Sequence, residues 1–365
     1  MSAVPPSAAD EAFQTNILQG VSRTFALTIP VLPDELCRAV GNGYLLCRIA
    51  DTIEDDAGLS LEEKKSFTDW FNRLVGSEGP DPAFGATLAP RLASHATDAE
   101  RELIRHTDSV LRITHSLSTP QRAALARCVR VMSDGMVHYQ GQETLDGLPD
   151  QAAMDRYCYY VAGVVGEMLT ELFCLRCPTL MPRRNELMLL GVSFGQALQM
   201  TNILKDIWED RARGACWLPR PGFESRGLIL SQLKPGEGGT AFANALHELV
   251  GIAHGHLRNA LTYTLALPRN EPGIRKFCLW ALGMAVLTLR KVAGNPAFLT
   301  GQAAKISRNS VKATVLLTSL AARQDWALES LFAVASWGLP HTPVVPRAPS
   351  YIEGMESRHQ LTEVA

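Results

Sequence analysis

Apolar residues recur at spacings of three and four along nearly every long segment of the chain, and strict alternation of apolar and polar residues is rare. The first pattern is typical of amphipathic helices and the second of half-buried strands, so the sequence predicts an all-α fold. The predicted helices cover residues 12–19, 34–55, 61–74, 98–115, 119–138, 151–174, 185–209, 228–266, 273–292 and 309–331.

Short clusters of Pro and Gly separate the predicted helices, and none is long enough to serve as a domain linker. We therefore expect a single domain over residues 11–337. Residues 1–10 are expected to be a disordered N-terminus, and residues 338–365, which contain several prolines, an irregular C-terminal tail.

Composition excludes some classes of partner. The 365 residues carry a formal net charge of -2, which gives no bias toward nucleic acid. The N-terminus has no basic and apolar regions of a signal peptide, and the longest apolar run, residues 278–289, is too short to span a bilayer. We expect a cytoplasmic protein with no transmembrane helix, which an apolar product could still draw to a membrane surface.

Two acidic clusters about 150 residues apart are the main clue to chemistry, Asp51 to Asp56 and Asp206 to Asp210. Residues four apart on a helix lie about 40° around the axis and roughly 6 Å along it, so the first and last aspartate of each D-x-x-x-D share a face. Like charges on one face repel unless a cation compensates them. Mg²⁺ accepts a few carboxylates and completes its coordination with water and phosphate oxygens.

A single D-x-x-x-D is more often a solvated helix face than a site. The segments before both clusters, residues 44–50 and 197–204, are mostly apolar and belong in a core. Their acidic ends are therefore expected to face a cavity, and the two clusters to face each other.

Four motifs, in this order, carry a resemblance to a known family: Ser22-Arg23-Thr24-Phe25, residues 44–56, residues 160–166 and residues 199–210. From about Ser22 to Arg308 the chain resembles the squalene and phytoene synthase family of head-to-head prenyltransferases. The resemblance implies a helical isoprenoid-synthase fold with a large central cavity. It also implies condensation of two farnesyl diphosphates to presqualene diphosphate, and the acid-rich first motif favours the squalene branch, in which NADPH then reduces the intermediate.

The resemblance assigns roles to residues at the matching positions. It implies that Mg²⁺ is held by Asp51, Glu54, Asp55, Asp206, Glu209 and Asp210. Diphosphate is expected at Ser22, Arg23, Thr24, Tyr44, Arg48, Gln199, Asn202, Lys205 and Arg213. NADPH is expected at Lys305 and Arg308.

Tyr160 is the candidate that steers or accepts the proton lost when the cyclopropane closes, although a tyrosine in this apolar stretch could equally be core. The small residues Ala162, Gly163 and Gly166 leave room for an isoprenoid chain, and helix packing would also explain them.

The chain departs from the family pattern at two places. Ala215 replaces the second arginine of an R-G-R stretch, so only Arg213 carries over, and Arg211 could compensate. The spacing of Arg308 from Lys305 differs by one residue from that of some relatives.

Other functions remain open from the sequence. A dehydrosqualene or phytoene synthase performs the first half of the reaction without reduction. A class I terpene cyclase or a chain-elongating prenyltransferase also uses paired acidic helices, and a non-catalytic helical partner would not need them intact.

Overall fold

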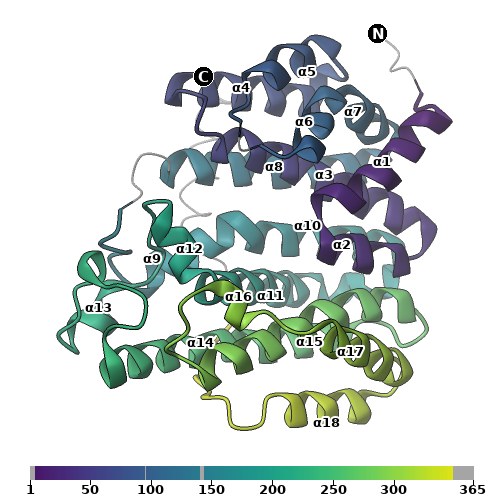
Figure 1. Ribbon diagram of the computed structural model, residues 1–365. Coiled ribbons are helices and arrows are strands. Elements are labelled where there is room, and N and C mark those ends of the chain that lie inside the picture. Colours follow the sequence, from purple (N-terminus) through teal and green to yellow (C-terminus); the bar gives the residue numbers. More distant parts are fainter. Residues whose placement is uncertain (1–4, 95, 140–143, 348–365) are drawn as a thin grey trace, which may run out of the picture. The chain divides into compact units, whose positions relative to one another are not determined.

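The computed structural model describes residues 5–94, 96–139 and 144–347, and these are helical through most of their length (Figure 1). Within them there is no β-strand, and one isolated bridge joins Leu148 to Pro219. The prediction of an all-α fold is confirmed. The helices are α1 (Ala8–Val21), α2 (Arg23–Thr28), α3 (Asp34–Asp55), α4 (Leu61–Arg73), α5 (Pro82–Leu88), α6 (Asp98–Arg105), α7 (Thr107–Ser116), α8 (Thr119–Tyr139), α9 (Gln151–Cys158), α10 (Val164–Arg176), α11 (Arg184–Lys205), α12 (Ile207–Ala212), α13 (Arg220–Glu224), α14 (Gly239–Ala266), α15 (Pro272–Gly294), α16 (Gly301–Ala304), α17 (Arg308–Ala321) and α18 (Asp325–Ala335).

The chain divides into two compact units, each of which is made from two separate stretches of sequence. Unit 1 comprises Met1–Gln142 with Met168–Arg184, and unit 2 comprises Glu143–Glu167 with Asn185–Ala365. The expectation of a single domain stays a prediction.

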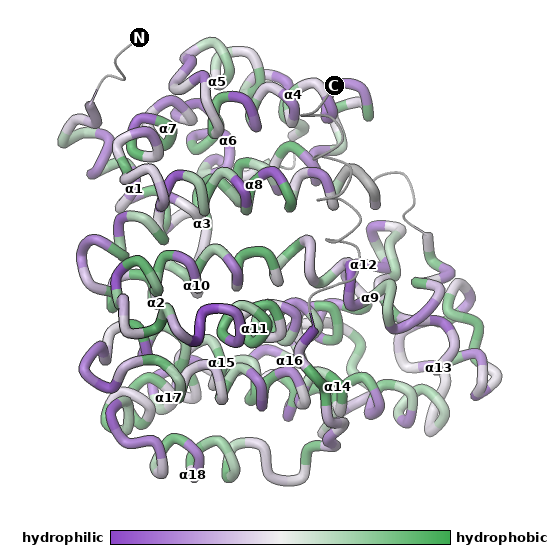
Figure 2. The backbone as a smooth tube through the Cα atoms, turned by 180° about the vertical axis from the view of Figure 1, so that it is seen from behind, coloured by the Kyte–Doolittle hydropathy of each residue, from purple (hydrophilic) through white to green (hydrophobic). Residues whose placement is uncertain are grey.

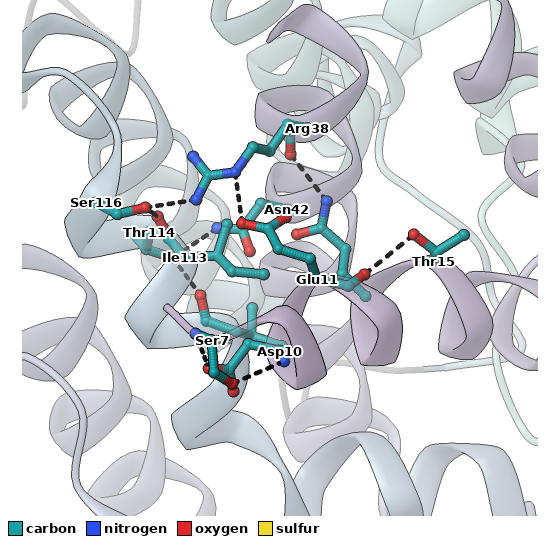
Figure 3. Close-up of polar contacts among 11 residues, drawn as sticks. Ser7, Asp10, Glu11, Thr15, Arg38, Asn42, Ile113, Thr114 and Ser116 are labelled. Atoms are coloured by element: carbon teal, nitrogen blue, oxygen red, sulfur yellow. Dashed lines mark hydrogen bonds and ion pairs between the residues drawn. The ribbon is translucent and has the colours of Figure 1, made fainter. Parts of the chain in front are cut away.

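In unit 1, polar contacts join the N-terminal helix α1 to α3, and α3 to α7 (Figure 3). Ser7 caps α1 in a capping box with Asp10, which is 3% exposed. The two carboxylate oxygens of Asp10 share the N–H of Arg112 Nε, each at 3.1 Å, and Oδ1 also accepts from Nη2 at 2.7 Å. Glu11 accepts from Arg38 Nε at 2.8 Å. Helix α1 thus begins at Ala8, inside the stretch 1–10 expected to be disordered, because the cap and the buried ion pair order its first turn.

In unit 2, α14 and α15 pack along each other, and much of α11 and α14 is coloured as hydrophobic (Figure 2). Arg275, which is 0% exposed, donates to the backbone oxygens of Leu265, Leu267 and Ala322 and to Asp325. This buried guanidinium joins the C-terminal ends of α14 and α17 to the start of α18.

The residues after α18 have no helix or strand up to residue 347, and part of them packs on α14. Thr342 N donates to Gly251 O at 3.0 Å, and Asn259 Nδ2 to Val344 O at 3.0 Å. A Cβ at Gly255 would lie 2.1 Å from Thr342 O, so the glycine makes this close approach possible.

The expectation that no segment could span a membrane is not confirmed. Three helical stretches are long and apolar enough by length and composition: Gln151–Arg176, Pro178–Lys205 and Pro272–Gly294. The longest uninterrupted apolar run does not reveal these stretches, because polar residues interrupt each one. Between 50% and 72% of each apolar window is buried inside the structure.

Candidate active site

The first acidic motif lies at the C-terminal end of α3, which follows the predicted range from residue 34 to residue 55. Leu45, Leu46 and Ile49 are fully buried and hold the helix in the core. Asp56, which is 3% exposed, ends it, because its carboxylate accepts hydrogen bonds from the backbone N–H groups of Gly58 and Ala93. Asp56 is therefore a structural residue.

Asp51 is a carboxylate of this motif whose electrostatic environment is strongly perturbed. Burial raises the pKa of Asp51 to about 7, Arg48 opposes the shift, and the charges of Asp55 and Glu100 add to it. The side chain still keeps 31% of its surface exposed. An incompletely compensated carboxylate with access to the surroundings is suited to bind a cation.

Arg48 connects this motif to α6. Its guanidinium pairs with Glu100 and lies 3.9 Å from Asp51 Oδ2, and its Nε is buried without a hydrogen-bond partner. Burial alone would lower the pKa of Arg48, but the charges of Asp51 and Glu100 raise it above its usual value. Glu54 is half-buried, with Lys64 Nζ on its backbone oxygen, and Asp55 is exposed at the last helical residue.

The S-R-T-F motif forms the junction between α1 and α2. Ser22 caps α2 by accepting from Phe25 N at 3.0 Å. Tyr44, from α3, donates to Val21 O at 3.1 Å and its ring lies 4.9 Å from that of Phe25. The motif is thereby joined to the helix that carries Arg48 and Asp51. Thr24 is exposed, and the side chain of Arg23 lies outside the described residues.

The second acidic motif lies at a bend in unit 2. Helix α11 ends at Lys205, Asp206 has φ -102° and ψ 19°, and α12 begins at Ile207. The predicted helix 185–209 is therefore wrong as one continuous element. Hydrogen bonds from Asp206 N to Asn202 O and from Asp210 N to Asp206 O nevertheless continue the helical pattern through the bend.

The two aspartates of this motif pair with neighbouring cations. Lys205 Nζ lies 2.9 Å from Asp206 Oδ2 and donates to Asn202 Oδ1 at 3.4 Å. Asp210 pairs with Arg213, whose side chain is 73% exposed. Burial raises the pKa of Asp210 to about 6, and Arg213 counteracts this shift. Gln199 is half-buried about two turns before the bend, and Asn202 is exposed about one turn before it.

Arg211 packs against Trp208 and binds a backbone oxygen. Its Nη2 donates to Leu233 O at 2.7 Å and its guanidinium lies 6.0 Å from the centre of the Trp208 ring. Ala215 is buried and its N–H bonds to Asp210 O. One side of the Arg211 guanidinium is thus engaged with the backbone, whereas its Nη1 is buried without a hydrogen-bond partner, and compensation for the absent arginine stays a prediction.

The Tyr160 motif contains a π-helical turn, η4 (Tyr159–Gly163), between α9 and α10. Such turns frequently mark functional sites. Tyr160 is 2% exposed, and its ring meets that of Tyr159 edge-on at 5.4 Å.

Glycines bring the Tyr160 segment into backbone contact with α11. A Cβ at Gly166 would lie 2.0 Å from Gly191 O, and one at Gly195 would lie 2.1 Å from Ala162 O. Helix packing therefore accounts for the small residues of this motif. It also fixes Tyr160 relative to the helix that leads to Gln199 and Asp206.

Lys305 and Arg308 follow α16 and are exposed. Lys305 Nζ donates to Gln302 Oε1 at 2.7 Å. Residues 300–324 contain four cations, Lys305, Arg308, Lys312 and Arg323, and no acidic residue. This charge fits the phosphates of NADPH.

No group of three or more His, Cys, Asp or Glu side chains within the described parts of the chain could hold a metal ion. The first motif and Arg48 belong to unit 1, whereas Tyr160, the second motif and Lys305 belong to unit 2. Each motif alone supplies carboxylates of the kind that Mg²⁺ uses together with water and phosphate oxygens, so the donor chemistry fits. The convergence of the two motifs stays a prediction.

Sequence reasoning missed three residues that shape the second motif. Gly301 and Phe298 contact it from about 90 residues away, and Trp208 donates its indole N–H to Phe298 O at 2.7 Å. Trp208 and Glu209, adjacent inside the acidic motif, were the residues that could have indicated these contacts. Nothing in the sequence showed that their partners are Phe298 and Gly301.

The all-α fold and a family match define the class as an all-α enzyme of the prenyltransferase type. The sequence profile described as squalene/phytoene synthase matches residues 18–310. The chain therefore belongs to the squalene/phytoene synthase family.

Individual relatives agree with this class. The chain is 32% identical over 288 residues to the squalene synthase of Eremothecium gossypii, with 78% of this chain and 62% of that protein covered. It is 30% identical over 308 residues to the squalene synthase of Schizosaccharomyces pombe, with coverages of 81% and 64%. The chain thus spans less than two thirds of the length of these relatives.

Solved structures share the helical isoprenoid-synthase fold. TcSQS with a bound ligand superposes with a TM-score of 0.73 at 25% identity, covering 90% of this chain and 91% of that one. A dehydrosqualene synthase with a bound ligand gives a TM-score of 0.62 at 19% identity, covering 89% and 97%, which shows the fold alone.

Proposed function

We propose that the protein is a squalene synthase. Two farnesyl diphosphates condense head to head to presqualene diphosphate, with loss of one diphosphate and one proton. Hydride transfer from NADPH, with loss of the second diphosphate, then gives squalene and NADP⁺. The names of the relatives support this activity, since those similar to most of the chain are squalene synthases.

The observation that carries the proposal is an aspartate of raised pKa beside an arginine in each acidic motif: half-buried Asp51, whose pKa is raised to about 7, and buried Asp210, whose pKa is raised to about 6. Both carboxylates are under-compensated by their arginine neighbours. A divalent cation would stabilise their charged forms.

In the proposed site, Asp51, Asp55, Asp206 and Asp210 hold Mg²⁺, which when bound supplies positive charge to neutralise the leaving diphosphate. Glu54 supports the first motif. This arrangement requires units 1 and 2 to bring the two motifs face to face.

The cations of the chain bind the phosphate oxygens. Arg48 offers a planar fork suited to bidentate contacts, and Lys205 a compact charge. Lys205 and Arg213 pair with aspartates in the free protein, and both can turn to phosphate when a metal takes over the carboxylates. Ser22, Arg23, Thr24, Tyr44, Gln199 and Asn202 complete the proposed diphosphate contacts.

Tyr160 is proposed to take or direct the proton lost at ring closure. Tyr160 is buried in a π-helical turn, which shields its phenol from solvent. A shielded phenol exchanges protons with the bound intermediate and not with bulk water. Lys305 and Arg308 are proposed to bind the phosphates of NADPH.

Peripheral membrane contact is proposed through the last two helices of unit 2. Exposed apolar side chains occur on α17, on α18 and just after it: Leu316 59%, Leu317 49%, Leu320 73%, Trp326 70%, Val334 71% and Trp337 80%. Tryptophan favours the membrane interface, and the cations of residues 300–324 favour anionic lipid.

Asn replacements in the acidic motifs test the site. Asp51→Asn and Asp206→Asn each remove one charge from the proposed metal ligands, and we expect turnover of farnesyl diphosphate to fall by on the order of 10²–10³-fold with the helical circular dichroism unchanged. Asp69→Asn, at an exposed helical acid, is the matched control and should retain turnover. Full activity in either motif variant would refute the site.

A further inference from the structure

Glu209 differs from the two aspartates of its motif in what it contacts. Its Oε1 accepts the backbone N–H of Gly301 at 2.7 Å. Its Oε2 lies 3.0 Å from the point where a Cβ at Gly301 would stand. Both carboxylate oxygens are therefore turned toward the segment 298–305, which begins at Phe298 and ends at Lys305.

Gly301 is buried against the acidic motif because it has no side chain. A Cβ there would lie 2.7 Å from Asp206 Oδ1 and 2.9 Å from Lys205 O, distances that Cβ atoms do not tolerate. The backbone of Gly301 is not left-handed, so the requirement is for close approach and not for conformational freedom.

A second contact fastens the same segment. Trp208, which is 6% exposed, donates its indole N–H to the backbone oxygen of Phe298 at 2.7 Å. Consecutive residues of the motif, Trp208 and Glu209, thus bind the segment at positions three residues apart. The side chain of Phe298 is itself 2% exposed, so this end of the segment is part of the core.

The partners of the three acids differ in how easily a ligand can replace them. Asp206 and Asp210 pair with the side chains of Lys205 and Arg213, which can turn away without moving the backbone. Glu209 binds a backbone N–H, and losing that charge-assisted hydrogen bond would leave the buried Gly301 N–H unpaired.

We infer that Glu209 is a positioning residue that docks the segment 298–305 on the second acidic motif, and is not a metal ligand. Docking places Lys305, four residues after Gly301, at a fixed point relative to Asp206. The proposed reductant site and the proposed diphosphate site are thereby held at fixed positions relative to each other. The role of Lys305 rests on the proposed function, whereas the docking contact does not.

The test combines Glu209→Ala, Glu209→Gln and Gly301→Ala, with Gly294→Ala as the matched control, since a Cβ at Gly294 meets no atom within 4 Å. Hydrogen exchange of residues 298–305 measures docking without turnover. We expect exchange at least about tenfold faster in Glu209→Ala and Gly301→Ala. Glu209→Gln, whose amide oxygen still accepts from Gly301, and Gly294→Ala should exchange as the unmodified protein does.

Calorimetric titration of Mg²⁺ in the presence of inorganic diphosphate separates positioning from ligation. We expect Glu209→Gln to keep its Mg²⁺ affinity within about threefold, whereas Asp206→Asn loses about tenfold or more. Equal losses in Glu209→Gln and Asp206→Asn, or unchanged exchange in both Glu209→Ala and Gly301→Ala, would overturn the inference. Failure of the proposed reaction alone would leave both readouts intact.

Discussion

At the scale of single residues, Asp10 shows how a buried carboxylate orders the start of the chain. Its side chain accepts from Arg112, from Ser7 and from the capping backbone N–H, and these contacts hold the pKa of Asp10 well below its usual range. The same group caps α1 and ties it to α7. Charge, capping and burial therefore act through one side chain.

Asp10→Asn keeps an acceptor for the cap and removes the charge. Because the folded pKa is depressed, the stability that the carboxylate contributes is present above the unfolded pKa near 3.8 and is lost as pH falls through the folded pKa. We expect the variant to lose about 1.5–3 kcal/mol of unfolding free energy at pH 7. Urea unfolding measures the difference in unfolding free energy between the unmodified protein and the variant. This difference should become smaller in acid, and a difference independent of pH would contradict this account.

The carboxylates of the acidic motifs have different roles that their spacing does not reveal. The sequence predicted Asp51 and Asp210 as ligands, which stays a prediction, and burial raises the pKa of both carboxylates. Glu209 was also among the predicted metal ligands, yet its carboxylate accepts a hydrogen bond from the backbone N–H of Gly301. The difference arises from a backbone contact about 90 residues away, which no local pattern encodes.

At the scale of elements, the packing of α10 on α11 positions the Tyr160 segment. Gly166 and Gly195 let the two helical segments touch through their backbones. Neither glycine has a left-handed backbone, so close approach alone explains them. The distance between Tyr160 and the second acidic motif is consequently set by small residues and not by the polar groups themselves.

Gly166→Ala tests this packing. The added methyl group would lie 2.0 Å from Gly191 O, so the helices must separate. We expect a loss of about 1–3 kcal/mol of stability and a fall in kcat larger than any rise in KM, because the displaced Tyr160 affects the reacting centre. Gly76→Ala, where a Cβ meets no atom within 4 Å, is the control. A thermal unfolding midpoint and kinetics equal to those of the control would refute the packing argument.

Helices with a strong apolar period were predictable, and their interruptions were not. The range of α3 follows from its pattern, and that of α8 nearly so. The bend at Asp206 and the break after α17 depend on tertiary partners, such as the bond from Arg275 to Ala322 O. Helix α2 is only six residues long, too short for a period to show.

At the scale of the whole molecule, the proposed apolar product links the chemistry to a membrane. The exposed leucines of α17 lie in residues 300–324, which contain four cations and no acidic residue, and two tryptophans follow on and after α18. A surface of this composition should bind anionic bilayers through apolar contact and charge together.

Triple replacement of Leu316, Leu317 and Leu320 by Ser tests the membrane surface. We expect binding to phosphatidylcholine vesicles containing phosphatidylglycerol to weaken by about tenfold or more in co-sedimentation. Leu61→Ser and Ile229→Ser together, at side chains 60% and 55% exposed, are the control. Equal binding by the triple variant and the control would exclude this surface.

The central claim is that the chain couples two farnesyl diphosphates and then reduces the product. The most direct measurement is mass-spectrometric product analysis after incubating purified protein with farnesyl diphosphate and Mg²⁺, with and without NADPH. We predict squalene with NADPH, and presqualene diphosphate or an unreduced hydrocarbon without it. The same product under both conditions, or a product built from one farnesyl chain, would contradict the account.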